Sequence, residues 1–358
     1  MRLVPLFVWV LVGGCLSVAQ VDPIEDDGVV EPPDTGAPQE PDPDPVVELE
    51  DLIVDLSVAR GSACVTRASG SLECWGEGPL TNVMGQESVD HGEPKDIVST
   101  SGLIEQGCML HADGGVSCWG FNHHLQLGGA IGRNEESTVP LRLPHVSNAV
   151  ALSSGHHHVC VLTDQDQAAC WGEPYSNSLG PQIFGSEEPV GFDLPDAVIV
   201  DVSASMEQVC ALGDSGRLWC WGSLGLRNGP LSDLSGNPIQ IPIDADLVGV
   251  SAGWQGGCAW DAAGAAWCWG SPLGAEEPVR LDLDPVSDVV VSWQQICTLD
   301  AGDGGVWCVE PVPDEVAAQT DFTHVAVGDT QVCAARRDGH VACWFRGELT
   351  WHEVEGAL

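Results

Sequence analysis

Seven pairs of cysteines constrain this chain more strongly than any other feature of its 358 residues. Nine residues separate the members of six pairs, ten separate those of the other pair, and the leading cysteines recur every 36 to 52 residues. This period is typical of propeller blades rather than of short solenoid turns. The pairs are Cys64 with Cys74, Cys108 with Cys118, Cys160 with Cys170, Cys210 with Cys220, Cys258 with Cys268, Cys297 with Cys308, and Cys333 with Cys343.

Each cysteine pair brackets a segment with the pattern of a β-hairpin. Between Cys108 and Cys118, two short strands flank a three-residue loop that ends in Gly114, where the backbone must adopt a positive φ. Directly opposed residues of an antiparallel pair lie within disulfide reach. We therefore predict one cross-strand disulfide in every repeat. Glycine stands at the same loop position in four other repeats, as Gly70, Gly216, Gly264 and Gly339.

Zinc binding is the alternative use of paired cysteines. Structural zinc sites use cysteines two to four residues apart and combine two such pairs, which the nine-residue spacing does not match. Disulfides persist in exported proteins, so the pattern also indicates export. The fifteenth cysteine, Cys15, is left without a partner, and a lone thiol in an exported protein is a liability unless it is lipidated or removed.

The hairpins carry apolar or small residues on both faces. Leu110 and Val116 share a face with Cys108 and Cys118, and the opposite face holds the tryptophan that follows the second cysteine in most repeats. Sheets covered on both sides are produced when blades stack radially, and closure of the ring limits exposed edges. We expect an all-β fold, a seven-bladed β-propeller with one cross-strand disulfide per blade, over residues 52–358.

The first 51 residues read as an export signal and a spacer. Residues 1–19 hold a short apolar run after Arg2, and two cleavage sites fit: a lipobox ending at Cys15, which would then be the lipidated residue, or cleavage after Ala19. Residues 20–51 hold seven prolines and twelve acidic residues without Lys or Arg, so we expect a disordered acidic Pro-rich linker. The chain would be secreted, or tethered to the cell envelope only through a lipid anchor.

The excess of acidic over basic residues limits the kinds of molecule that the protein is expected to bind. Twelve Lys and Arg stand against 53 Asp and Glu, a formal net charge of -41. Phosphate backbones and anionic lipid surfaces would repel such a surface, so nucleic acid is not an expected partner, whereas a basic protein would suit it.

The sequence lacks the familiar catalytic motifs, and we expect neither a catalytic site nor a cofactor or metal. His156, His157 and His158 alternate between faces of a strand and would not share one metal ion, so a solvated cluster is the simpler interpretation. Three tryptophans would form a carbohydrate or peptide platform if exposed, but tryptophan in a propeller more often packs between blades. These are Trp254, Trp293 and Trp351.

The repeat resembles that of the regulator of chromosome condensation family. The resemblance rests on Cys118-Trp119-Gly120 and Cys268-Trp269-Gly270, on the trailing segment at residues 121–128, and on the leading segment at residues 153–160. It recurs through residues 52–358 and implies a seven-bladed propeller that recognises proteins through loops on one face. The family includes a nuclear nucleotide-exchange factor and a secreted bacterial inhibitor of β-lactamase.

The chain departs from the family pattern in several repeats. The family's histidine two residues before the first cysteine survives only as His158; the other repeats carry Ser62, Gln106, Gln208, Gly256, Gln295 and Gln331. We interpret this position as an inter-blade hydrogen bond. Val309 replaces the expected tryptophan in the sixth repeat, and the seventh lacks the glycine, so we expect less regular blades there. The resemblance also implies that the tail at residues 349–354 pairs with the N-terminal blade.

The function expected from the sequence is that of an extracytoplasmic, monomeric scaffold without catalytic activity. It would bind an unidentified protein partner, a basic one or a secreted enzyme that it inhibits. The alternative is a carbohydrate-binding or hydrolytic propeller that uses its central channel, which carboxylates converging on that channel would favour.

Overall fold

The computed structural model describes residues 52–353, except 60, 77–93, 100–105, 174–176, 181–184, 196–197, 223–235, 272, 293–294, 329 and 346–347. Internal contacts divide the chain into two units, Met1–Asp44 and Pro45–Leu358, and all described residues belong to the second. The predicted signal segment, the linker to residue 51 and Cys15 lie outside the described residues. In the described part, no helix has the length and apolar character of a membrane span.

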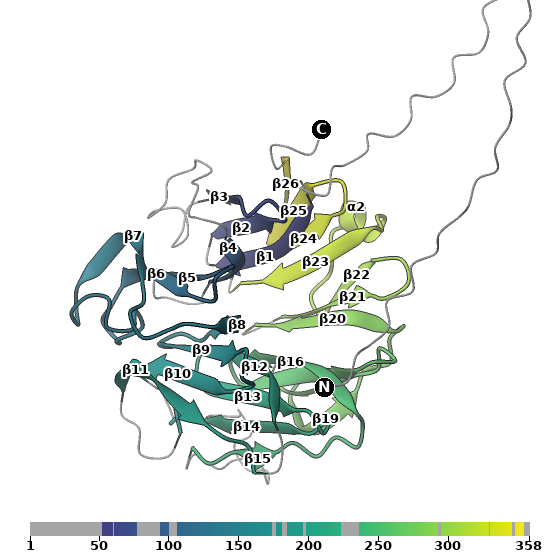
Figure 1. Cartoon of the computed structure of the whole chain (residues 1–358). Coiled ribbons are helices and arrows are strands. Elements are labelled where there is room, and N and C mark those ends of the chain that lie inside the picture. Colours follow the sequence, from purple (N-terminus) through teal and green to yellow (C-terminus); the bar gives the residue numbers. More distant parts are fainter. Residues whose placement is uncertain are drawn as a thin grey trace, which may run out of the picture. The chain divides into compact units, whose positions relative to one another are not determined.

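Seven antiparallel sheets form the blades (Figure 1). Blades 1 and 6 have three described strands: β1 (Ile53–Ala59), β2 (Ser62–Arg67) and β3 (Leu72–Gly76); then β20 (Val286–Val291), β21 (Ile296–Asp300) and β22 (Val306–Cys308), followed by the short helix α2 (Asp314–Ala317).

The other five blades have four strands each. Blade 2 contains β4 (Pro94–Ser99), β5 (Gln106–His111), β6 (Val116–Phe121) and β7 (Glu136–Arg142); blade 3, β8 (Ala149–Ser154), β9 (His158–Thr163), β10 (Ala168–Gly172) and β11 (Ser186–Phe192); blade 4, β12 (Ile199–Ala204), β13 (Gln208–Gly213), β14 (Leu218–Gly222) and β15 (Ile239–Gln240); blade 5, β16 (Leu247–Gly253), β17 (Gly256–Asp261), β18 (Ala266–Gly270) and β19 (Ala275–Arg280); blade 7, β23 (Phe322–Val327), β24 (Val332–Arg336), β25 (His340–Phe345) and β26 (Glu348–Glu353).

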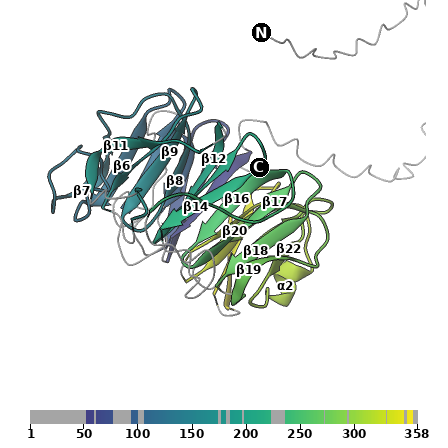
Figure 2. The same cartoon turned by 90° about the horizontal axis from the view of Figure 1, so that it is seen from below.

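The first strand of each blade faces the centre of a closed ring (Figure 1). Each of these strands contacts the first strand of the next blade, in the order β1, β4, β8, β12, β16, β20, β23 and back to β1. Figure 2 shows strands of neighbouring blades standing side by side. The predicted seven-bladed propeller is confirmed.

All seven predicted disulfides are present, one in each blade. The two cysteines of a blade are direct partners in the register of its second and third strands. Their Cα atoms lie 4.0 to 4.1 Å apart. In blade order, the bonds join Cys64 to Cys74, Cys108 to Cys118, Cys160 to Cys170, Cys210 to Cys220, Cys258 to Cys268, Cys297 to Cys308, and Cys333 to Cys343.

The turns inside the disulfide hairpins follow from the loop sequences. Gly114 has a φ of 78°, in the left-handed region that the three-residue loop requires at its last position. Asp166 takes the same place in blade 3 with a φ of 57°, a conformation that aspartate tolerates better than most residues. The turn residues and the cysteine register therefore agree in every hairpin that the sequence predicted.

Packing between blades joins the disulfide of one blade to the tryptophan of the next. Trp119 packs with the disulfide of blade 1, and Trp171 with that of blade 2. Between blades 5 and 6 the tryptophan is missing, because the sequence has Val309 there, and Val309 is exposed. The arrangement recurs at four further interfaces, through Trp221, Trp269, Trp344 and the partly buried Trp75.

The expected inter-blade hydrogen bonds occur at two of the glutamines that replace the family histidine. Gln208 Nε2 donates to Gly253 O of blade 5 at 2.6 Å, and Gln331 Nε2 donates to Ser62 O of blade 1 at 3.0 Å. Gln295 Nε2 instead donates to a glutamate of its own blade. Blade 6 has three strands and is less regular, as expected, whereas the same expectation for blade 7 is wrong, because that blade has four well-paired strands.

The tail was expected to pair with the N-terminal blade, and this prediction is wrong. Strand β26 pairs with β25 of its own blade over six residue pairs and completes the seventh sheet. Side chains close the ring instead: His324 Nε2 donates to Val54 O at 3.1 Å, and the rings of Trp75 and His352 lie 5.0 Å apart.

Candidate functional site

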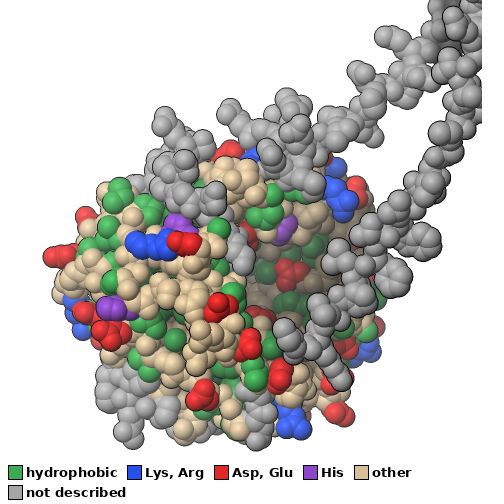
Figure 3. Space-filling view, in the orientation of Figure 1, with side chains coloured by type: hydrophobic (Ala, Val, Ile, Leu, Met, Phe, Trp, Pro, Cys, Tyr) green, Lys and Arg blue, Asp and Glu red, His purple; other side chains and the backbone are tan. Residues whose placement is uncertain are grey.

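The first strands of the blades enclose a central cavity of about 300 Å³. Its described lining comes from blades 1, 3, 4, 5, 6 and 7 and contains no Lys or Arg. Figure 3 shows the hollow, with acidic and hydrophobic side chains in its depth. The cavity therefore offers a polar, anionic environment at the axis of the ring.

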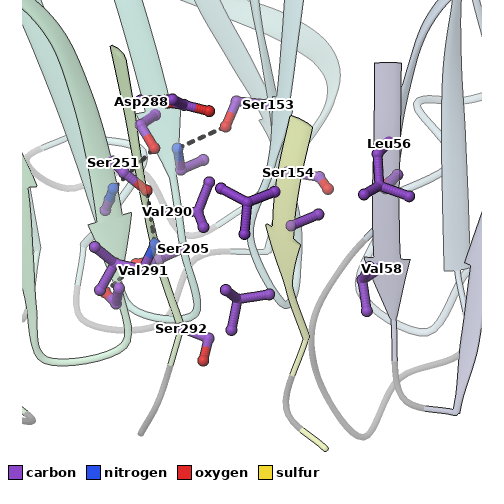
Figure 4. Close-up of a pocket in the computed structure, with 18 of the residues that line it drawn as sticks. Leu56, Val58, Ser153, Ser154, Ser205, Ser251, Asp288, Val290, Val291 and Ser292 are labelled. Atoms are coloured by element: carbon purple, nitrogen blue, oxygen red, sulfur yellow. Dashed lines mark hydrogen bonds between the residues drawn. The ribbon is translucent and has the colours of Figure 1, made fainter. Parts of the chain in front are cut away.

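A row of serines forms the wall contributed by blades 3, 4 and 5. Ser153 Oγ accepts a hydrogen bond from the backbone N–H of Ala204 in the next blade at 2.8 Å, and Ser203 Oγ accepts one from Ala252 N at 2.9 Å. Ser251 Oγ accepts a third from the first strand of blade 6 at 3.0 Å, as Figure 4 shows. These hydrogen bonds connect the first strands of neighbouring blades. Because each Oγ acts as an acceptor, the serines also line the cavity with hydroxyl groups that can still donate.

The opposite wall is acidic. Asp55 of blade 1 and Asp288 of blade 6 line the cavity on either side of His324 of blade 7. Burial raises the pKa of Asp288 to about 6, and the negative charges of Asp201 and Asp55 act in the same direction. Burial also raises the pKa of Asp201, although two backbone N–H groups oppose this effect. Three carboxylates from separate blades thus influence one site.

His324 connects this wall across the closure of the ring. Burial lowers its pKa, while the charge of Asp55 and the hydrogen bond to Val54 O act in the opposite direction. Its Nδ1 lies 3.0 Å from Thr323 Oγ1. The imidazole thereby holds blade 7 against blade 1 beside two carboxylates.

A β-bulge occurs near the start of the first strand of every blade. Bulges re-aim side chains at sheet edges. In four blades the extra residue is a valine with a large exposed fraction, and we call these residues the valine ring: Val54 44%, Val150 39%, Val200 47% and Val248 53%. Two of them directly precede Asp55 and Asp201 in the chain, so apolar and acidic groups occupy the same end of the first strands.

The histidine cluster between blades 2 and 3 is buried, which corrects the expectation of a solvated one. His124, in the loop after β6, lies over His157 with ring centroids 3.8 Å apart, and His156 and His157 are 4.7 Å apart. Burial lowers the pKa of His156 and of His158 to about 4 and that of His157 to about 2, and neighbouring histidines add to the effect.

Glu173 lies on the outer side of this cluster. It accepts hydrogen bonds from Arg133 at 2.5 Å and from His124 Nδ1 at 3.0 Å. Burial would raise the pKa of Glu173, but these two partners lower it. Across residues 52–353, with the gaps given above, no group of three or more His, Cys, Asp or Glu side chains has a geometry that would hold a metal ion.

Two of the three tryptophans considered as a platform are described, and they lie on different elements. Trp254 lines the central cavity, Trp351 lies on the outermost strand β26, and Trp293 lies outside the described residues.

Sequence reasoning missed Asp55, Asp288 and His324, which line the cavity. Each stands nine residues before the first cysteine of its repeat, as does Asp201. Aligning the repeats on cysteine could therefore have revealed a shared position at the centre of the ring.

Comparison with known proteins agrees with the repeat architecture. The Regulator of chromosome condensation (RCC1) repeat matches residues 113–162. The human E3 ubiquitin-protein ligase HERC2 is 28% identical over 210 residues, which are 53% of this chain and 4% of HERC2. The chain therefore spans only a small part of that relative's length.

Two solved structures share the fold. Prp20p from Saccharomyces cerevisiae aligns with a TM-score of 0.57 and 18% identity, over 74% of this chain and 70% of its own. The CRINKLY WD40 ectodomain of the receptor kinase ACR4 from Arabidopsis thaliana also gives a TM-score of 0.57 with 18% identity, over 83% and 96% of the two chains. The repeat match and the seven sheets show a seven-bladed β-propeller that contains an RCC1 repeat at residues 113–162.

Proposed function

We propose that the protein is an exported, non-catalytic scaffold that binds a basic protein partner on the face where the first strands begin. The observation that carries this proposal is the valine ring, four exposed apolar side chains near the starts of strands that line the central cavity. Exposed apolar groups on a surface rich in polar residues are typical of contact sites. A net charge of -41 favours a cationic partner.

The similar proteins add support. The structure of Prp20p is described with its binding properties to Gsp1p and histones, and histones are basic proteins. The ACR4 match is to the ectodomain of a receptor kinase. Proteins of this fold thus include one that binds other proteins and one that forms an ectodomain, and the proposal combines these two properties in the present chain.

Export is supported by the seven disulfides, which require an oxidising compartment. In this proposal residues 1–19 are a signal peptide, Cys15 is lipidated or removed, residues 20–51 are the spacer and residues 52–358 are the binding domain. Inhibition of a secreted enzyme is one form that such binding would take.

A four-site variant tests the proposal. In V54S/V150S/V200S/V248S the valine ring is lost, whereas V139S/V279S removes two equally exposed valines from the outer strands β7 and β19. The wild type and each variant are expressed in the cells that naturally produce the protein. Their partners at the cell envelope are cross-linked to them, and the captured proteins are quantified by mass spectrometry. We expect the ring variant to lose a basic partner that the wild type and the outer-strand variant retain. Identical capture by all three proteins would contradict the proposal.

A second candidate is binding or hydrolysis of a carbohydrate in the cavity. It is favoured by Asp288, whose pKa is raised to about 6 by burial, and by the carboxylate of Asp55 in the same cavity. Incubation with a panel of neutral oligosaccharides would show binding or cleavage that D55N and D288N both abolish. If no oligosaccharide binds or is cleaved, this candidate fails.

A further inference from the structure

The central cavity and the valine ring are both formed by the first strands of the blades. The walls of the cavity carry two carboxylates on one side and serine hydroxyls on the other, and the four valines stand near the starts of the first strands of blades 1, 3, 4 and 5. In Figure 4, Asp288 lies at the opposite end of the cavity from Ser292. A ligand that enters beside the valines therefore meets Asp288 and Asp55 first.

The arrangement of the carboxylates suits the binding of a cationic group that is larger than a metal ion. Asp55, Asp201 and Asp288 come from blades 1, 4 and 6, and within the described residues no set of such side chains converges closely enough to coordinate a metal. Their charges nevertheless act on one another. Carboxylates spread over the wall of a partly enclosed, low-dielectric cavity focus their field on its interior and attract an organic cation.

A buried hydroxyl gives a second, independent indication of a ligand. Ser154 lines the cavity with only 9% of its surface exposed, and its Oγ has no hydrogen-bond partner among the described residues. Buried polar atoms without partners are uncommon because leaving them unsatisfied costs free energy. A polar group that enters the cavity would satisfy this hydroxyl.

The size of the cavity is suited to a single side chain. About 300 Å³ is at the lower limit of small-molecule pockets, and a long flexible side chain fills such a space more readily than a folded loop. A guanidinium group presents five donors in a planar fork, so it can bond to carboxylates and hydroxyls on different walls at once. Apolar residues on either side of that arginine would contact the valine ring.

We propose that the cavity receives an arginine side chain of the partner polypeptide, flanked by apolar residues that pack on Val54, Val150, Val200 and Val248. This inference rests on the proposed function and assigns its site. The arginine side chain is bound by carboxylates inside the central cavity, and the flanking apolar residues contact the valine ring.

Binding of a defined peptide tests the inference. The probe is acetyl-Leu-Arg-Leu-amide, and its control is the same peptide with citrulline, which keeps the shape of arginine but lacks the charge. Affinity is measured by calorimetry at low and at physiological salt. The arginine peptide should bind about tenfold more tightly than the citrulline peptide, and the difference should shrink with added salt, because charge-assisted hydrogen bonds and long-range attraction supply it.

Matched variants locate the site. D55N/D288N removes two charges from the cavity, and E276Q/E277Q removes two from the exposed outer strand β19. The first pair should weaken binding of the arginine peptide about tenfold, and the second by less than about twofold. Equal affinities for the two variants, or equal binding of the two peptides, would overturn the inference. Binding of neutral oligosaccharides that depends on Asp55 and Asp288, without arginine binding, would overturn it in favour of a carbohydrate site.

The two proposals fail in different ways. If partner capture requires the valine ring but the arginine peptide does not bind, the scaffold proposal stands and the arginine site is rejected. If the arginine peptide binds through Asp55 and Asp288 but capture is unchanged in the valine-ring variant, the face proposed for the protein partner is wrong.

Discussion

Replacing His158 by glutamine should make the fold less sensitive to acid by about 2 kcal/mol between pH 7 and pH 5. His158 begins β9 with none of its surface exposed, and its Nδ1 lies 3.4 Å from Ser178 Oγ. Glutamine is the natural choice because blades 2 and 4 carry Gln106 and Gln208 at the equivalent position, each completely buried.

The magnitude follows from the difference between the folded and unfolded states. Burial, reinforced by His156, lowers the pKa of His158 from 6.5 to about 4. As the pH falls below 6.5 the unfolded chain therefore binds a proton that the folded chain does not, and stability is lost until the pH reaches about 4. At pH 5 the pH lies about 1.5 units below the unfolded value, and each unit is worth about 1.4 kcal/mol.

The assay is urea unfolding of the disulfide-intact protein at pH 7 and at pH 5, followed by tryptophan fluorescence. Carboxylates contribute equally to the wild type and the variant, so the difference between their acid dependences isolates His158. His145→Gln makes the same exchange on the exposed surface and serves as the control. Wild type and H158Q losing the same stability between the two pH values would refute the reasoning.

Three further predictions concern the same ring. D288N should raise the free energy of unfolding at pH 7 by about 3 kcal/mol, because the raised pKa of Asp288 means that its ionised form opposes folding above pH 6. The gain in stability should vanish below pH 4. Urea unfolding measures both values, and a lower stability of D288N at pH 7 would contradict the prediction. C258A/C268A should lower the thermal midpoint and cost about 2 to 3 kcal/mol, as expected from closing so short a loop, and calorimetry would show it; an unchanged midpoint would count against the disulfide. W221F removes the hydrogen bond from Trp221 Nε1 to Ser178 O, which is 2.9 Å long and buried between blades. Urea unfolding should show that the free energy of unfolding falls by about 1 to 3 kcal/mol. An unchanged free energy of unfolding would contradict this prediction.

The blades could be predicted from the sequence because their determinants are local. The spacing of Cys108 and Cys118 and the positive φ required at Gly114 specify a hairpin without reference to the rest of the chain. Repetition of that hairpin then specifies the ring. The tryptophan after the second cysteine was correctly expected to pack between blades, since Trp171 and Trp221 each bond to a loop of the preceding blade.

The central site could not be predicted because it depends on closure of the ring. Asp55 and Asp288 are more than two hundred residues apart in the sequence, and only the contacts of β1 with β23 and of β23 with β20 bring them to one cavity. The bulge that exposes Val54 carries no sequence signal beyond an ordinary apolar strand. The histidine cluster was misjudged for a similar reason, since His124 from another blade covers His157.

The tail illustrates the limit of reasoning from resemblance. Pairing of β26 with a neighbouring blade was expected from the family, but the alternation of the tail suits its own blade equally well. The six pairs join strands that are only two residues apart in the chain, whereas exchange between blades needs closure of the whole ring first. Local pairing is therefore the arrangement found.

The proposed export requires a ring in which every blade carries a disulfide formed in an oxidising compartment. The decisive measurement is the intact mass of the protein from its own cells, alkylated before and after reduction. We predict that alkylation adds no mass before reduction and fourteen groups after it, with Cys15 either lipid-modified or absent with the signal peptide. Free thiols before reduction, in a chain that retains its N-terminal segment, would contradict the account of an exported, disulfide-closed propeller.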